Sequence, residues 1–189
     1  MACDISGSLS LAEARAALAD LLEPCCQTET VALGQALGRI LAEPVSARLA
    51  SPLFDNSAMD GFALKAADLA VTTPLTICGT ALAGHPFCGE WPDGAVVRIM
   101  TGAPVPEGAA TVVMQEQTRS VGAGVIELLA PARAGQNIRL RGEDIQLGQP
   151  VLAAGESLNA RNLPLLAAVG GGRGPGLQAA AGGLFQQRR

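Results

Sequence analysis

The sequence predicts an α+β fold: a mixed helical and β first domain formed from both ends of the chain, with an inserted antiparallel β-rich, barrel-like domain. Two observations lead to this prediction. Apolar residues recur at helical spacing in the N-terminal and C-terminal parts, whereas the middle consists of short apolar runs separated by glycine and proline. Several short strands at such spacing are typical of a compact antiparallel barrel or sandwich.

The first helix begins at a capping box. In the segment Ser10-Leu11-Ala12-Glu13, the side chains of Ser10 and Glu13 can each accept a hydrogen bond from a backbone N–H at the helix start. A second helix is predicted over residues 33–43, ended by Pro44. Apolar residues at helical spacing support the two helices, with Pro24 after the first of them: Leu11, Ala14, Leu18, Leu21 and Leu22, then Leu33, Leu37, Ile40 and Leu41.

Five strands are expected in the middle of the chain, where apolar runs alternate with turn residues. They are Leu75 to Gly79, Ala95 to Met100, Thr111 to Gln115, Val125 to Leu129 and Ile138 to Leu140, with turns at Gly94, Gly108, Gly122 and Gly124. A helical pattern returns over residues 157–169, with Asn159 as a candidate cap and Gly170 as the residue past the helix end.

These elements divide the chain into a discontinuous first domain (residues 1–44 plus 143–170) and an inserted β-domain (residues 45–142). Residues 171–189 are expected to form a disordered or aberrant tail. From Gly170 onward the chain contains seven glycines, three arginines and no acidic residue. Its few large apolar side chains, Leu177, Leu184 and Phe185, return less free energy on burial than the ordering of so many residues costs.

Composition excludes several classes of function. The net charge is −4, the pI is about 5.0, and no basic stripe is present, so nucleic acid is not expected as a partner. No signal peptide and no apolar run of membrane-spanning length is visible, which indicates a cytoplasmic protein without membrane contact. The five cysteines lack the spacing of a metal site and are expected to be reduced; His85 and Cys88 have no second pair of ligands.

The segment from Phe54 to Ala63 (FDNSAMDGFA) is the most informative part of the chain. It places two carboxylates, a carboxamide and a hydroxyl between aromatic residues. One interpretation is a tight turn, because Asn-Ser and Asp-Gly are common turn residues. The other is a loop held in place by Phe54, Met59 and Phe62, so that its polar groups face one site.

Three further segments accompany this motif: RIMTGAPVPEGA (residues 98–109), VVMQE (112–116) and RGEDI (141–145), with GEWP (89–92) between the first motif and these. In order, spacing and wording, residues from Leu9 to Gly170 closely resemble the molybdopterin molybdenumtransferase family of the MoeA type, which is similar to the gephyrin E-domain. The resemblance implies the same layout of a first domain built from two segments around an inserted β-domain.

The family resemblance also implies a reaction. Such enzymes insert molybdate into adenylylated molybdopterin, release AMP and yield molybdenum cofactor, with Mg²⁺ as cofactor and a site composed across a homodimer. In the family a pterin-binding α/β domain and a C-terminal β-domain follow, and this chain is expected to stop before either. A shifted reading frame, an error in gene prediction or a chosen chain end are equal explanations. The chain alone is therefore expected to be inactive; the alternative is a non-catalytic dimerisation or scaffold module.

The resemblance assigns site residues by their match to the motifs. Asp60 and Thr101 are the candidate catalytic residues, and Asp60 is also the candidate metal ligand or water-orienting group; its alternative is a turn aspartate that caps Gly61 and Phe62. Ser57 and Gly102 are the candidate substrate-binding residues. The Thr101 hydroxyl and nearby backbone N–H groups are expected to donate to an oxyanion, unless the Thr101 loop is only a turn out of a strand.

The other charged residues of the motifs are expected to be structural. Asp55 and Asn56 shape the first loop. A salt-bridged return into the first domain is expected from three residues of the last motif, and two glutamates are expected to be surface or structural charges: Arg141, Glu143 and Asp144, then Glu107 and Glu116.

Overall fold

The computed structural model describes residues 9–21, 28–170 and 177–179. Its elements, in chain order, are α1 (Leu11–Asp20), β1 (Glu29–Val31), η1 (Leu33–Gln35), β2 (Val45–Ser46), β3 (Asn56–Ser57), β4 (Gly61–Lys65), η2 (Ala66–Asp68), β5 (Leu75–Ala81), β6 (Ala95–Ile99), β7 (Ala109–Met114), η3 (Gln115–Gln117), β8 (Thr118–Gly122), β9 (Val125–Leu128), β10 (Ile138–Arg139), β11 (Pro150–Leu152), α2 (Asn162–Ala168) and β12 (Leu177–Ala179), where η marks a 3₁₀ turn. The fold is mixed α and β, as predicted.

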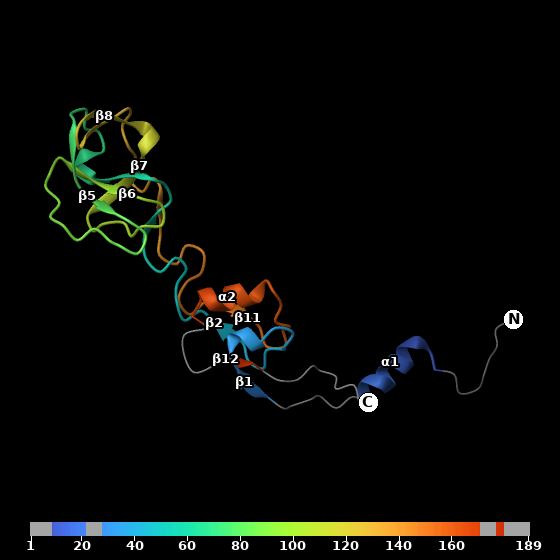
Figure 1. Cartoon of the computed structure of the whole chain (residues 1–189). Helices are drawn as coiled ribbons and strands as arrows, with labels where there is room; N and C mark the ends of the chain where they lie inside the picture. Colours follow the sequence, from blue (N-terminus) through green and yellow to red (C-terminus); the bar gives the residue numbers. More distant parts are fainter. Residues whose placement is uncertain (1–8, 22–27, 171–176, 180–189) are drawn as a thin grey trace. The chain divides into compact units, whose positions relative to one another are not determined.

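The chain forms two compact units (Figure 1). The outer unit comprises Met1–Ser46 and Pro150–Arg189, and the inserted unit comprises Ala47–Gln149. The insertion thus begins at Ala47 and ends at Gln149, whereas the sequence pattern placed these limits at residues 45 and 142. None of the helices among the described residues has the length and apolar character needed to span a membrane.

The capping box at the start of α1 is confirmed. The backbone N–H of Ser10 donates to the Glu13 carboxylate over 2.7 Å, and the N–H of Glu13 donates to the Ser10 hydroxyl over 3.3 Å. No residue of α1 is buried, so its apolar positions do not contribute to the core of the described part of the chain. The predicted stop at Pro24 lies outside the described residues.

The predicted helix over residues 33–43 is wrong. Only the single 3₁₀ turn η1 forms, and Gly38 then adopts a positive φ of 78°. From there the chain runs extended beside the segment that precedes α2: the N–H of Gly38 donates to Leu158 O, and the N–H of Leu41 donates to Glu156 O. Two glycines in the pattern weaken a helix, and the non-local pairing satisfies the same backbone groups.

For the same reason α2 is shorter than the predicted helix over residues 157–169. Arg161 rather than Asn159 directly precedes the helix, and the Arg161 side chain makes no capping hydrogen bond. Asn159 lies two residues earlier, where its Oδ1 accepts hydrogen bonds from the N–H groups of Arg161 and Asn162, at 2.8 and 3.4 Å. Gly170 follows the helix with φ 91°, as predicted. Around α2 lies the core of the outer unit: Val31, Ala36, Leu41, Leu152, Leu158 and Leu166.

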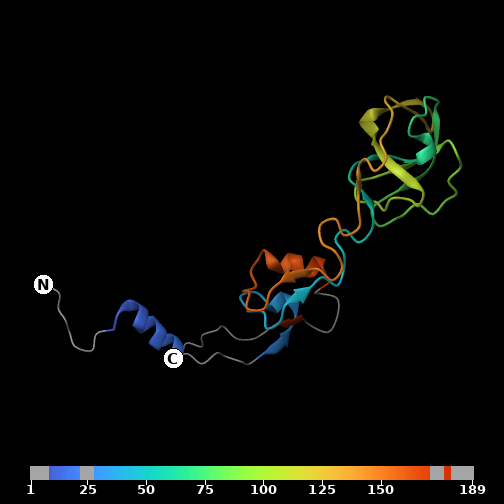
Figure 2. The same ribbon diagram turned by 180° about the vertical axis from the view of Figure 1, so that it is seen from behind.

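Part of the expected tail forms a strand. β12 pairs antiparallel with β1, with Val31 opposite Leu177 and Glu29 opposite Ala179. The two strands lie side by side in both views (Figure 1, Figure 2). The prediction of an irregular tail is therefore wrong for Leu177–Ala179, because pairing on the free edge of β1 needs backbone groups rather than an alternating apolar pattern. Residues 171–176 and 180–189 lie outside the described residues.

The inserted unit is built on a curled six-stranded sheet in the order β7-β4-β6-β5-β9-β8. The five predicted strands are present as β5, β6, β7, β9 and β10, within a residue or two of their expected limits at most ends. Two strands of the sheet, β4 and β8, were not predicted, and Gly122 belongs to β8 rather than to a turn. Gly94, Gly108 and Gly124 have positive φ, as turns require.

The sheet is antiparallel except for one pair of strands. β5 and β6 run parallel, with Thr80 opposite Arg98 and Ala81 opposite Ile99, so a wholly antiparallel insertion was the wrong expectation. Residues 82–94, which connect these two strands, are long enough for the crossover that a parallel pair requires. Aromatic packing orders this connection: Phe87 and Trp91 lie edge to face at 6.4 Å, and Lys65 Nζ donates to Trp91 O over 2.8 Å.

Apolar clusters cover both faces of the sheet. The members of one cluster are Phe62, Leu64, Leu75, Val96, Val113 and Ile126, and those of the other are Ala63, Ala81, Val97, Ile99, Ala103 and Val112. Apart from Lys65 and Arg98, the residues of the central strands β4 and β6 are buried, so these strands are mostly apolar and do not alternate between apolar and polar residues.

Candidate active site

The first motif and the Thr101 loop meet at one end of the sheet. β4 begins directly after Asp60, and β6 ends just before Thr101; because β4 and β6 are antiparallel, the start of one lies beside the end of the other. Backbone hydrogen bonds join the two loops: the N–H of Gly102 donates to Ser57 O over 2.8 Å, and the N–H of Ser57 donates to Ala103 O over 3.0 Å.

Asp60 and Thr101, the two candidate catalytic residues, contact each other. Asp60 Oδ1 accepts hydrogen bonds from both the Thr101 backbone N–H and the Thr101 hydroxyl, each over 2.7 Å. Asp60 is half-buried and Thr101 is exposed. The carboxylate thus links the two motifs, which differs from the predicted alternative of a turn aspartate that caps Gly61 and Phe62.

These hydrogen bonds determine the charge of Asp60. The hydrogen bond from the Thr101 side chain, followed by that from the Thr101 backbone, lowers the pKa of Asp60, and the positive charge of Arg98 acts in the same direction. Hydrogen bonds to the ionised form favour it over the neutral form. Asp60 is therefore a carboxylate at neutral pH, and its hydrogen bonds with Thr101 weaken only as the pH falls through the lowered pKa.

We expect Thr101→Val to raise the pKa of Asp60 toward its ordinary value, because the variant lacks the hydroxyl that donates to Oδ1. A carbon-13 NMR titration of the Asp60 carboxyl measures this shift. Thr76→Val is the matched control, since Thr76 is an exposed threonine of β5 at a different end of the sheet. An unchanged Asp60 pKa in Thr101→Val would mean that the hydrogen bond does not form in solution.

The backbone N–H groups of the Thr101 loop already have hydrogen-bond partners within the inserted unit. The N–H groups of Thr101, Gly102 and Ala103 donate to Asp60 Oδ1, Ser57 O and Met100 O, respectively. The Thr101 hydroxyl also donates to Asp60. The expectation that these groups donate to an oxyanion does not fit this arrangement, because each N–H has a single proton to give.

Ser57 has a similar internal role. It is buried, at 1% exposed, and its hydroxyl donates to Met59 O and accepts from the Met59 N–H. The Ser57 side chain thus holds the loop in shape and does not point to solvent. Of the three apolar residues that were expected to hold the loop, only Phe62 is buried, at 8%, whereas Phe54 and Met59 are 44% and 42% exposed.

Asp55 connects the first motif with the last one. Its Oδ1 accepts a hydrogen bond from the backbone N–H of Arg141 over 2.7 Å. The expected salt bridges of the last motif are made by Arg139 rather than Arg141: the Arg139 guanidinium contacts Asp144 at 2.6 Å and Glu143 at 3.5 Å. The register of β10 with β3, where Arg139 pairs with Asn56, adds to this connection.

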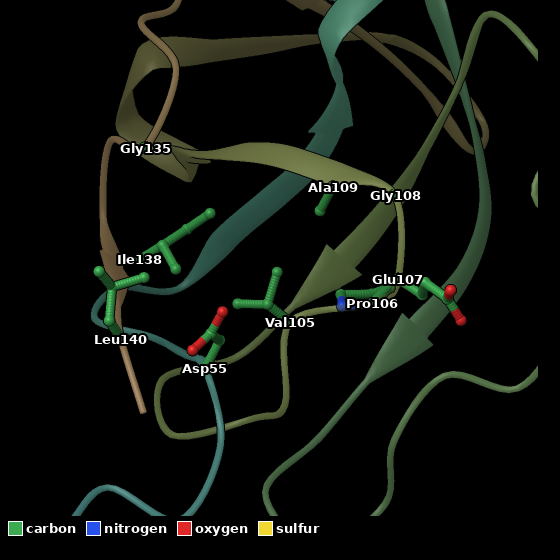
Figure 3. A pocket seen from close by; sticks show the side chains of 9 residues that line it. All are labelled: Asp55, Val105, Pro106, Glu107, Gly108, Ala109, Gly135, Ile138 and Leu140. Atoms are coloured by element: carbon green, nitrogen blue, oxygen red, sulfur yellow. The ribbon is translucent and has the colours of Figure 1, made fainter. Parts of the chain in front are cut away.

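A cavity of about 420 Å³ adjoins Asp55. Apolar groups form most of its wall, and the lining residues are Asp55, Val105, Pro106, Glu107, Gly108, Ala109, Gly135, Ile138 and Leu140. Figure 3 shows the Asp55 carboxylate near Leu140 and Val105, whereas the Glu107 carboxylate points away from the other side chains. This cavity could not be predicted from the sequence, because its lining comes from three separate parts of the chain, at residue 55, residues 105–109 and residues 135–140.

The described residues contain no group of three or more histidine, cysteine or acidic side chains that could hold a metal ion. His85 pairs with Leu82 through backbone hydrogen bonds, and the Cys88 thiol contacts Pro86 O. Asp60 still fits a Mg²⁺ site of the kind that uses one carboxylate together with substrate phosphates, because only Oδ1 of its two oxygens has a hydrogen-bond partner.

Comparison with known proteins finds relatives that match most of this chain. Residues 9–170 match the family model described as the MoeA N-terminal region (domain I and II). The chain is 43% identical over 162 residues to a molybdopterin molybdenumtransferase from Haemophilus influenzae, and 38% identical over 165 residues to one from Synechococcus elongatus. These matches cover 86% and 84% of this chain but only 40% of each relative, so the chain spans about two fifths of their length.

Solved structures show the same fold. The crystal structure of the molybdopterin biosynthesis moeA protein from Pyrococcus horikoshii OT3 matches with a TM-score of 0.73 and 35% identity, over 80% of this chain and 41% of that one. The family match, the sequence relatives and the structural likeness all cover the two units described above. This chain therefore belongs to the family of the MoeA N-terminal region (domain I and II).

Proposed function

We propose that the chain forms the N-terminal part of a molybdopterin molybdenumtransferase, which inserts molybdate into adenylylated molybdopterin and releases AMP. The family match and the names of the relatives support a role in molybdenum cofactor biosynthesis. The observation that supports a particular location for the active site is the hydrogen-bonded pair of Asp60 and Thr101. It places an ionised carboxylate at an accessible end of the sheet, where two motifs meet.

The reaction requires an anionic substrate to be held and a phosphoanhydride to be broken. In this proposal Thr101 orients Asp60 and keeps it ionised, and the second carboxylate oxygen binds Mg²⁺ or orients a water molecule. When bound, Mg²⁺ would offset the charge of the phosphate oxygens. The buried Ser57 and the backbone of Gly102 keep the two loops together, so their contribution to substrate binding is to position this carboxylate.

The rest of the site belongs, in this proposal, to parts of the enzyme that residues 1–189 do not cover. The enzyme would act as a cytoplasmic homodimer in which the inserted β-unit of one subunit faces the pterin-binding domain of the other. The 189 residues would then supply one wall of the site, and would not complete the reaction alone.

We expect that the 189-residue chain binds adenylylated molybdopterin without useful affinity, because a partial site leaves charged groups of the ligand unpaired. Isothermal titration calorimetry measures this directly. The matched control is a chimera in which residues 9–170 replace the corresponding segment of the Haemophilus influenzae relative. Micromolar binding by the 189-residue chain would contradict the composite site.

A further inference from the structure

Arg98 is the one exposed residue of β6, a strand whose other four residues are buried. The match of the motifs assigns Arg98 no role, although a charged residue is rare within a strand of buried apolar residues. The sheet register places it opposite Phe62 of β4 and Thr80 of β5, so the side chains of Arg98 and Thr80 lie on one face. Thr80 is exposed as well.

The sheet register also brings Asp60 close to Arg98. Asp60 directly precedes Gly61, and Gly61 pairs with Ile99, the residue that follows Arg98 in β6. The influence of the Arg98 charge on the pKa of Asp60 agrees with this placement. A cation therefore lies close to the candidate catalytic carboxylate.

The charge of Arg98 is not matched by a contact with an acidic group. The ion pairs of the described residues use other cations, and none includes Arg98: Arg39, Lys65, Arg119 and Arg139. Neither the guanidinium of Arg98 nor the hydroxyl of Thr80 makes a hydrogen bond with the described residues. A guanidinium has five N–H donors in a planar fork, which suits tetrahedral oxyanions.

Arg98 matters for anion binding because the hydrogen-bond donors of the Thr101 loop already have partners. An oxyanion that approached Asp60 and Thr101 would find the N–H groups of the loop and the Thr101 hydroxyl already engaged. Next to an ionised carboxylate, such an anion needs a positive group to overcome repulsion. Arg98 and Thr80 supply a cation and a free hydroxyl on the same face.

We propose that Arg98, assisted by Thr80, binds a tetrahedral oxyanion of the substrates beside the Asp60–Thr101 pair. This inference rests on the proposed function and deepens it. The oxyanion is either molybdate or a phosphate of the adenylylated pterin, since both offer oxygens that a guanidinium can contact in a bidentate manner.

The test is a titration of the 189-residue chain with sodium molybdate and, separately, with inorganic phosphate, followed through the side-chain ¹H–¹⁵N signals of its arginines. We expect the Arg98 Nε signal to shift on saturation with at least one anion. Arg98→Gln should weaken that anion's binding about tenfold or more, as expected when a charge-assisted hydrogen bond is lost. Binding in Arg98→Gln and the control can be followed by the neighbouring backbone signals of Thr80 and Thr101.

Arg133→Gln is the matched control, because it removes the same charge from an exposed arginine elsewhere in the inserted unit. A shift with molybdate alone would assign Arg98 to the molybdate, and a shift with phosphate alone would assign it to the pterin phosphate. The proposal fails if Arg98 responds to neither anion, or if both variants weaken binding equally, since the effect would then be that of net charge.

A second measurement separates this inference from the proposed function. In the chimera that carries residues 9–170, Arg98→Gln should raise the KM for the substrate to which the titration assigns Arg98, either molybdate or adenylylated molybdopterin, with a smaller change in kcat. The titration does not depend on turnover. An inactive chimera with an anion-responsive Arg98 would therefore contradict the proposed function only, and a normal KM in an active Arg98→Gln chimera would contradict the inference only.

Discussion

Asp60→Asn should reduce the turnover of the chimera carrying residues 9–170 by at least about a hundredfold, since a charged group that holds a metal or orients a nucleophile contributes several kcal/mol to catalysis. The variant keeps the shape of the side chain, and its amide oxygen can still accept from Thr101. The melting temperature should therefore change little. Release of AMP from adenylylated molybdopterin in the presence of molybdate measures turnover.

Asp93→Asn is the matched control for this substitution. Asp93 is an exposed aspartate in the same unit, and it pairs with Lys65 at 2.9 Å. The variant should retain normal turnover. If the Asp60→Asn chimera also turned over normally, Asp60 would be a structural link between two loops and the inserted unit would serve as a scaffold. If it lost its fold, while the folded fraction kept full activity, the structural interpretation would hold as well.

The second large effect is expected for Gly61→Ala. Gly61 lies in β4 between β6 and β7, and an added Cβ would come within 1.9 Å of Val113 O, a backbone atom of β7. The strands must separate to make room, so the free energy of unfolding of the inserted unit should fall by at least about 4 kcal/mol, in the range reserved for severe core disruption. Urea denaturation followed by Trp91 fluorescence measures this, because Trp91 is the single tryptophan of the chain.

Gly122→Ala controls for the loss of a glycine from the same sheet. Gly122 belongs to β8 at the sheet edge, and its added Cβ would lie 3.9 Å from the nearest side chain, an ordinary contact. Its φ does not require glycine, so the free energy of unfolding should stay within about 1 kcal/mol of the original value. A Gly61→Ala protein as stable as Gly122→Ala would mean that β4 does not lie between β6 and β7 as described.

The elements that were predicted correctly depend on local signals. The capping box of Ser10 and Glu13 and the glycine after α2 act within a few residues of the helix ends that they determine. The helix predicted over residues 33–43 failed because its competitor, the segment before α2, lies more than a hundred residues away. The parallel pairing of β5 with β6 was equally hidden, since the order of strands in a sheet is set by tertiary packing.

In the candidate site, too, the residues could be predicted from local motifs, whereas their contacts could not. The match of the motifs predicted Asp60 and Thr101 as the two catalytic residues, and the side chains of these residues form a hydrogen bond in the structure. Their interaction was not predictable, because it depends on the register of β4 with β6. The register of β4 with β6 also determines which hydrogen-bond donors near Asp60 already have partners. Arg98 could therefore be proposed as an anion-binding residue only from the structure.

The two ends of the inserted unit meet: the N–H of Ala47 donates to Gln149 O, and the N–H of Gly148 donates to Ala47 O, both over 2.8 Å. In the outer unit, Ser46 pairs with Pro150 directly beyond these residues. Joining two segments across a flexible loop of roughly a hundred residues costs about 4 kcal/mol of chain entropy. Once the inserted unit has folded, its closed ends remove most of this cost, so the outer unit is expected to fold later and to lose stability whenever the insertion unfolds.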